Sequence, residues 1–191
     1  MRVAVDARGL ANPISGIGRY TYCMLEELVK FDEHEWFLYS DRPLLHRIDN
    51  ANVRVRESRS SNRLFSLVRT QFLFCQWAIK DQVDVFWSPR HHLPLLLPSR
   101  IKTVLTIHDL VWVKYPETMA WTNLLLEKLL MPRSLNKANL VTAVSDSTRD
   151  DVIGTFSIDA KKVCKVLAAS VEIDPIREFV RLEVDNYFLF V

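Results

Sequence analysis

Cysteine and glycine are both scarce in this sequence, and the scarcity of cysteine already excludes some classes of protein. The chain has three cysteines and four glycines in 191 residues. The cysteines lie far apart without a C-x-x-C pair, so we expect buried, reduced thiols rather than a disulfide framework. Three of the glycines, Gly9, Gly16 and Gly18, lie close together near the N-terminus, which marks that segment as a loop of special geometry.

Long hydrophobic runs and a strong excess of one charge are also missing. No stretch approaches the ~18 uninterrupted apolar residues of a membrane-spanning helix, and residues 1–8 do not have the pattern of a signal peptide. A net charge of +2 does not favour a nucleic-acid partner. With 49% hydrophobic residues, the chain is expected to form one well-packed domain. We expect it to be cytoplasmic, with peripheral contact at the inner face of the membrane as an open alternative.

Short apolar runs alternate with stretches of helical periodicity along the chain. Strands are predicted at 2–7, 36–40, 53–55, 83–87, 103–107, 139–144 and 162–167, and helices from 17 onward and at 64–80, 121–136 and 147–156. Near-continuous apolar strands are typical of a parallel sheet that is buried on both faces. The predicted fold is therefore α/β: a Rossmann-like, doubly wound, mostly parallel sheet with helices on both faces.

The first predicted strand leads into a glycine-containing loop and then a helix. Gly16, Ile17, Gly18 and Arg19 open this helix, and Ser15 is a plausible N-cap. Such a helix start directs backbone N–H groups at an anion. Three interpretations stay open here: a dinucleotide site, which lacks the third glycine of its fingerprint; a loop that binds nothing; and a loop that contacts a substrate.

Polar side chains follow each of the later central strands. They are Ser88, Arg90 and His91 after 83–87, His108 and Asp109 after 103–107, and Ser145 and Arg149 after 139–144. The carboxyl ends of parallel strands share one edge of the sheet, where ligands of such folds bind. We therefore expect these residues and the 16–19 loop to line one cleft, with Asp109 able to orient His108.

Other chemistries fit these residues less well. A metal site is not expected, because His91 and His92 are adjacent and adjacent side chains of an extended chain point in opposite directions. Ser145 lacks a G-x-S-x-G motif, and there is no P-loop motif. A basic run (Arg54, Arg56, Arg59 and Arg63) precedes the apolar helix at 64–80 and indicates either a solvated face or contact with anionic lipid.

Several segments together resemble a known family. These are DARGLANPISGIGRYTY at 6–22, VDVFWSPRHHLPLL at 83–96, TVLTIHDLVWVKYPETM at 103–119 and ANLVTAVSDSTRDDV at 138–152. They are similar to the N-terminal half of retaining glycosyltransferases of the GT-B fold, family 4 (group 1), particularly the mannosyltransferases of O-antigen and other surface polysaccharides.

The resemblance implies transfer of a hexose from a nucleotide sugar, with GDP-mannose favoured, to a polysaccharide or lipid-linked acceptor, without a bound metal or other cofactor. It implies that Gly16 and Gly18 lie near the donor phosphates, that His108 contacts the donor sugar supported by Asp109, and that Ser145 and Arg149 line the cleft.

The resemblance also implies a division into domains, in which residues 1–170 form the acceptor-side domain. Residues 171–191 form a linker and the first strand of a nucleotide-sugar-binding domain that the chain otherwise lacks, so the fragment is expected to be inactive. The alternatives are a nucleotide- or dinucleotide-binding domain of another enzyme class and a non-catalytic binding module.

Overall fold

A computed structural model of the chain describes residues 1–58 and 66–167, and for 66–69 the backbone only. Its elements in chain order are β1 (Arg2–Asp6), η1 (Arg8–Ala11), α1 (Gly16–Leu28), β2 (Glu35–Ser40), β3 (Val53–Glu57), α2 (Ser66–Lys80), β4 (Val85–Ser88), β5 (Lys102–Ile107), α3 (Val111–Lys114), η3 (Pro116–Thr118), α4 (Trp121–Lys137), β6 (Leu140–Ala143), α5 (Asp146–Phe156), η4 (Ala160–Lys162) and β7 (Val163–Lys165). The proposed linker and strand at 171–191 lie outside the described residues.

The strands form one seven-stranded sheet in the order β3-β2-β1-β4-β5-β6-β7, and every pairing is parallel. The chain first moves outward from β1 to β3 and then returns to place β4 on the other side of β1. This reversal of direction between β1 and β4 is the point at which open α/β sheets bind ligands. The predicted doubly wound parallel sheet is confirmed.

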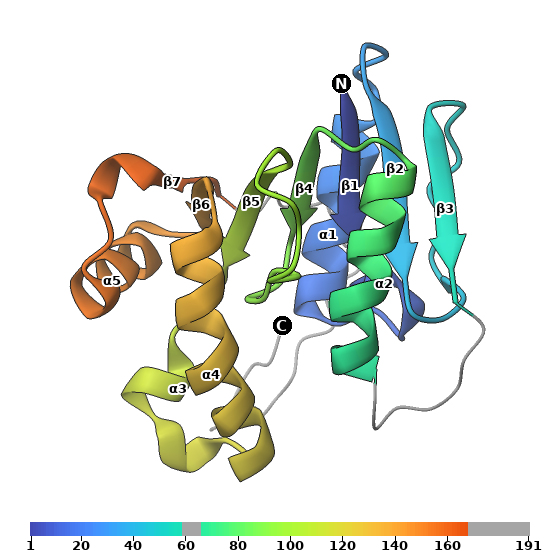
Figure 1. The fold of residues 1–191 in the computed structure, drawn as a ribbon. Coiled ribbons are helices and arrows are strands. Elements are labelled where there is room, and N and C mark those ends of the chain that lie inside the picture. The colour runs from blue at the N-terminus through green and yellow to red at the C-terminus, as the bar shows by residue number, and fades with distance from the viewer. Residues whose placement is uncertain (59–65, 168–191) are drawn as a thin grey trace, which may run out of the picture.

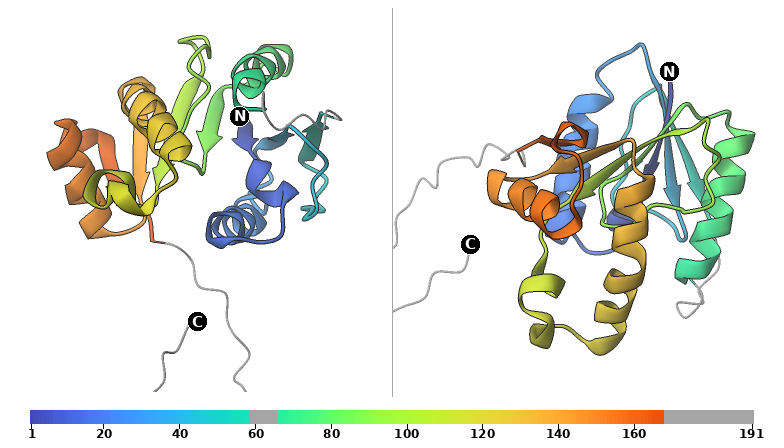
Figure 2. Two further views of the ribbon diagram at one scale, coloured as in Figure 1. Left: turned by 90° about the horizontal axis from the view of Figure 1, so that it is seen from below. Right: turned by 60° about the vertical axis from the view of Figure 1, so that its left-hand side comes forward.

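Helices cover the two faces of the sheet unequally (Figures 1 and 2). α1 lies on one face, and α2 and α4 lie on the other. Two separate groups of buried residues correspond to these layers, one including Leu25 of α1 and the other including Phe74 of α2 and Leu135 of α4. Strands buried from both sides explain the near-continuous apolar runs in the sequence.

Three details differ from the expected elements. The 3₁₀ turn η3 at Pro116–Thr118 is separate from α4, because Met119 and Ala120 between them have non-helical backbone torsions. α4 continues through Pro132 to Lys137, one residue beyond its predicted end. α3 was not expected at all. It follows directly from the end of β5, so it bears on the site described next.

Candidate functional site

The N-terminus of α1 lies beside η1, close to the carboxyl end of β1. Ser15 caps the helix, and its Oγ accepts a hydrogen bond from the Gly18 N–H at 3.3 Å. Gly18 is buried against Gly9, and a Cβ added to it would lie 2.9 Å from the Gly9 carbonyl oxygen. Position 18 therefore requires glycine, because the backbones of residues 9 and 18 approach each other too closely for a side chain. Gly16 has no neighbour within 4 Å of an added Cβ, and Arg19 is exposed, so both are accessible to a ligand.

His108 follows β5, and two neighbours determine the position of its ring. Its Nε2 lies 2.9 Å from the Pro89 carbonyl oxygen, so Nε2 carries the proton and donates it there. The ring packs edge-on against Tyr20, with centroids 4.9 Å apart. Tyr20 belongs to the first turns of α1, so His108 lies on the α1 side of the sheet, near the 16–18 turn.

Burial lowers the pKa of His108, and the hydrogen bond to the Pro89 carbonyl only partly opposes this effect. The imidazole is therefore neutral at pH 7. In this tautomer Nδ1 carries a lone pair, and none of the described residues donates a hydrogen bond to it. His108 can thus accept a hydrogen bond from a hydroxyl group through Nδ1.

Asp109 has a different contact from the expected one. Its Oδ1 accepts a hydrogen bond from the Val111 N–H at 3.1 Å, which opens α3. The carbonyl of Pro89 rather than this carboxylate orients His108. Asp109 is exposed and acts on His108 only through its charge.

His91 and His92 converge on one carboxylate, that of Glu127 in α4. His92 Nε2 lies 3.1 Å from Glu127 Oε2, and His91 Nδ1 lies 3.7 Å from Oε1. The backbone N–H of His108 donates to His91 Nε2 at 3.2 Å. The expectation that adjacent histidines diverge was wrong, because residues 89–91 bend instead of continuing the strand.

Glu127 is an ionised, mostly buried carboxylate. Burial alone would raise its pKa, but the hydrogen bonds and charges of His91 and His92 outweigh burial and lower the pKa to about 2. Glu127 thereby fixes the loop that contacts His108. The sequence contained no local signal for this residue, because Glu127 lies on an ordinary helical stretch far from both histidines in the chain.

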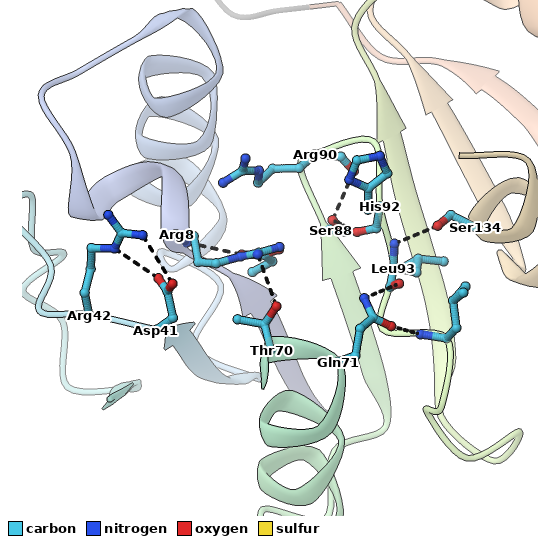
Figure 3. Close-up of polar contacts among 12 residues, drawn as sticks. Arg8, Asp41, Arg42, Thr70, Gln71, Ser88, Arg90, His92, Leu93 and Ser134 are labelled. Carbon is cyan, nitrogen blue, oxygen red and sulfur yellow. Dashed lines mark hydrogen bonds and ion pairs between the residues drawn. The ribbon is translucent and has the colours of Figure 1, made fainter. Parts of the chain in front are cut away.

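The loop after β4 is held by side chains from α2 and α4 (Figure 3). The Ser88 hydroxyl is buried and lies 3.0 and 2.7 Å from the carbonyl oxygens of Arg90 and His92, so it closes the turn. Gln71 of α2 bonds the backbone of the loop at Leu93 and at Leu95. These contacts hold the backbone of the loop in its observed conformation.

A buried ion pair, which the sequence analysis did not single out, lies at the end of β1. The guanidinium of Arg8 donates to Asp6 Oδ2 at 2.6 Å and to Thr70 Oγ1 at 3.2 Å. Burial alone would raise the pKa of Asp6, but the charge and hydrogen bonds of Arg8 hold it below its usual range. Arg90 extends from the end of β4 into the same region, partly exposed.

Ser145 and Arg149 lie on α5, towards the β7 edge of the sheet. Ser145 caps α5 by accepting from the Thr148 N–H at 3.1 Å, and the Thr148 hydroxyl donates to the His108 carbonyl oxygen at 3.1 Å. Arg149 donates to the Val163 carbonyl oxygen of β7 at 3.4 Å. Most of the predicted site residues thus lie at the carboxyl ends of β1, β4 and β5, whereas Ser145 lies after β6 and Arg149 lies beside β7.

Within residues 1–58 and 66–167, no group of three or more His, Cys, Asp or Glu residues has the arrangement of a metal site. In the same part of the chain, no helix is long and apolar enough to cross a membrane.

Comparison with known proteins gives one curated relative and several similar solved structures. O-antigen chain mannosyltransferase B of Escherichia coli is 26% identical to this chain, over 85% of the chain and 46% of that protein. Anabaena Alr3699/HepE, solved in complex with UDP and glucose, has a TM-score of 0.53 at 18% identity and is matched over 45% of its length. The lipopolysaccharide outer core galactosyltransferase WaaB has a TM-score of 0.54 at 14% identity and is matched over 48%.

These likenesses agree with the predicted fold, the N-terminal half of a GT-B glycosyltransferase. This chain spans about half the length of the proteins it matches. The family model described as Glycosyltransferase Family 4 matches residues 14–166, most of the chain. This chain therefore belongs to glycosyltransferase family 4.

Proposed function

We propose that the chain is the acceptor-side half of a retaining glycosyltransferase that moves a hexose from a nucleotide sugar to a polysaccharide or lipid-linked acceptor. Mannose from GDP-mannose is the proposed donor, because the curated relative is a mannosyltransferase. The observation that carries the proposal is the neutral His108 beside the N-terminus of α1. That arrangement combines a hydrogen-bond acceptor for a sugar with N–H groups suited to an anion.

The proposed roles follow from the contacts of each group. Nδ1 of His108 accepts a hydrogen bond from a hydroxyl of the donor sugar. The N–H groups in the first turn of α1, at Gly16 and Ile17, face the diphosphate and stabilise the negative charge that develops as the glycosidic bond breaks. Arg19 adds a positive charge next to them. The second half of a full-length enzyme supplies the nucleotide-binding surface, so the 191-residue chain alone is expected to transfer nothing.

Substrate-binding or supporting roles remain predictions for five further residues, Ser88, His91, Asp109, Ser145 and Arg149. The contacts of Ser88 and His91 favour an indirect role, since both hold the loop next to His108. In the structure the Asp109 carboxylate accepts from the Val111 N–H at the start of α3, and Ser145 caps α5. Arg149 would have to leave Val163 to reach a substrate at the β1–β5 junction.

The test is a transfer assay on the full-length protein. Purified enzyme is incubated with GDP-mannose, UDP-glucose or UDP-galactose and with lipid-linked or oligosaccharide acceptors, and products are identified by mass spectrometry. We expect transfer from one donor, with the anomeric configuration retained in the NMR spectrum of the product. No transfer from any donor, together with no binding of any donor by calorimetry, would refute the proposal.

For the lipid-linked acceptor we propose peripheral contact with the inner face of the membrane. The predicted contact region, 54–80, offers less support than expected, because Arg56 pairs with Asp81. α4 offers more: Trp121, Leu125 and Leu129 are 74%, 48% and 44% exposed and are spaced four residues apart on one side of the helix.

Co-sedimentation of the full-length protein with liposomes tests this contact. We expect binding to vesicles containing anionic lipid and a loss of binding in the double variant Trp121→Ser, Leu125→Ser. The matched control is Leu45→Ser, which removes a leucine of 63% exposure from a loop before β3. Equal sedimentation of all three proteins would contradict the proposed contact.

A further inference from the structure

Arg90 is a partly exposed arginine whose guanidinium makes no hydrogen bond or ion pair with any residue that the structure describes. It extends from the loop after β4 towards η1, where Arg8 lies (Figure 3). Arg8 itself is engaged by Asp6 and Thr70 and lies over the ring of Phe74, 5.5 Å from its centroid. Two guanidinium groups thus share the space between the ends of β1 and β4.

The carboxylates around these arginines already have other partners. Asp6 is bound by Arg8. Asp41, which is close enough to influence both Arg8 and Arg90, is paired with Arg42 at 3.2 Å. Glu127, on the other side, is shared by His91 and His92. At the end of β4, the guanidinium of Arg90 is therefore left without a hydrogen-bond or ion-pair partner among the described residues.

The surroundings of Arg90 disfavour its unpaired charge. Burial and the neighbouring charge of Arg8 lower the pKa of Arg90, although Asp6, Asp41 and Glu127 partly compensate. An arginine stays protonated under all ordinary conditions, so the remaining way to relieve the repulsion is to bind an anion. The planar guanidinium suits a tetrahedral oxyanion, which it can bind with two parallel hydrogen bonds.

We propose that Arg90, with Arg8 behind it, forms a binding site for a phosphate-type oxyanion at the β1–β4 junction, and that this anion is a phosphate group of a substrate. Arg90 is the direct ligand. Arg8 is held by Asp6 and supplies a second, fixed positive charge. The identification of the anion with a substrate rests on the proposed transferase function, but the existence of the anion site does not. The phosphate can come from the nucleotide-sugar donor or from a phosphate-linked acceptor.

The first experiment measures the anion site without using activity. The full-length protein is treated with phenylglyoxal, which modifies accessible arginines, in the presence of increasing inorganic phosphate at constant ionic strength, and modification is mapped by peptide mass spectrometry. We expect phosphate to protect Arg90 with a saturable dependence and to leave Arg100 unprotected. Arg100 is an exposed arginine before β5, at the opposite edge of the sheet. Equal protection of Arg90 and Arg100 by phosphate, or protection of neither, would overturn the proposal.

The second experiment identifies the source of the phosphate. Arg90→Gln and the control Arg100→Gln each remove one charge, and steady-state kinetics are measured with donor and acceptor varied separately. We expect Arg90→Gln to raise the KM for one substrate about tenfold, which corresponds to about 1.4 kcal/mol, with partial recovery in Arg90→Lys. A higher KM for the donor identifies the donor diphosphate, and a higher KM for the acceptor identifies an acceptor phosphate.

The outcomes separate the two proposals. If the wild-type enzyme transfers no sugar, the proposed function fails, while the phenylglyoxal protection still decides whether the anion site exists. If the enzyme is active and Arg90 is protected, but neither KM changes in Arg90→Gln, phosphate is an adventitious ion only and the assignment to a substrate is overturned.

Discussion

His108 is positioned by a backbone carbonyl and an aromatic ring rather than by a neighbouring charged side chain. The Pro89 carbonyl fixes its tautomer, and the edge of Tyr20 fixes its plane. A carbonyl cannot change its charge with pH, so the orientation of the ring is stable over the neutral range. The nearby carboxylate of Asp109 is directed to a helix start instead.

The first prediction concerns the protonation of His108 in the full-length enzyme. Its pKa lies below the usual 6.5, so the ring is neutral at pH 7 and gains a proton on Nδ1 as the pH falls through the lowered pKa. Protonation removes the hydrogen-bond acceptor, and we expect kcat/KM to be flat near neutrality and to fall on the acid side.

Two substitutions at this position test that mechanism. His108→Ala should reduce kcat/KM about tenfold, the effect of losing one hydrogen bond. His108→Gln retains an amide oxygen that can accept the bond and does not titrate, so the acid limb should disappear. An unchanged pH profile in His108→Gln would remove His108 from the proposed role.

The second prediction concerns Glu127, which holds His91 and His92. Glu127→Gln removes the charge that both rings share, so we expect a loss of about 1–2 kcal/mol of unfolding free energy at pH 7 in urea titrations. The control is Glu117→Gln, an exposed glutamate on η3, which should change stability by less than about 0.5 kcal/mol. Equal midpoints for the two variants would show that the histidine contacts are energetically neutral.

At the scale of elements, the important feature is the close packing of α1 on η1. The helix start needs a capping residue and must also approach the preceding turn without a side chain between them. Ser15 satisfies the first need, and the pair Gly9 and Gly18 satisfies the second. This packing places the first turn of α1 at the end of β1 and brings Tyr20 against His108.

The third prediction compares two glycines of that turn. In Gly18→Ala the new methyl group would lie 2.9 Å from the Gly9 carbonyl oxygen, so the backbone must shift and we expect a loss of about 1–3 kcal/mol in denaturant titrations. Gly16→Ala meets nothing within 4 Å and should be neutral or stabilising by up to about 1 kcal/mol. The idea fails if Gly18→Ala is as stable as Gly16→Ala.

At the scale of the whole molecule, buried carboxylates connect elements that are distant in the sequence. Asp6 binds Arg8 at the end of β1, and Asp81, after α2, accepts from Arg56 of β3 and from the Tyr39 hydroxyl of β2. For Asp6, Asp81 and Glu127, burial alone raises the pKa, but the hydrogen bonds and charges of their partners outweigh it and lower the pKa. The stability of the fold therefore depends on all three staying ionised.

The fourth prediction follows from these lowered pKa values. A carboxylate with a lower pKa in the folded state stabilises the protein above its unfolded pKa and loses that contribution as the pH falls through the folded value. We expect the urea midpoint to be constant from pH 7 to about 5 and to decrease steadily from about pH 5 towards pH 2. Asp81→Asn should lower the midpoint at pH 7 and flatten the decrease, whereas Asp159→Asn, on the exposed turn before η4, should leave the slope unchanged.

Much of the architecture could be predicted from the sequence. Most of the predicted strands are near-continuous apolar runs separated by helical periodicity, a pattern typical of a parallel sheet that is buried on both faces. β3, in which arginines alternate with valines, is the more exposed exception. The topology of such a sheet then placed the polar residues after β4, β5 and β6 at one edge. The four segments that resemble the family, which lie between residues 6 and 152, were equally readable, because each is contiguous in the chain.

What the sequence by itself determined was therefore local: the elements, their order, and which polar residues follow each strand. Only the tertiary structure decided the surroundings of those residues, including the shared carboxylate of Glu127, the Pro89 carbonyl on His108, and the unpaired guanidinium of Arg90 near the Asp6–Arg8 pair. The physical reason is that hydrogen bonds and ion pairs act over a few ångströms in space. These partners come from α4, from the bend after β4 and from η1, and no pattern in a single segment records that the fold brings them together.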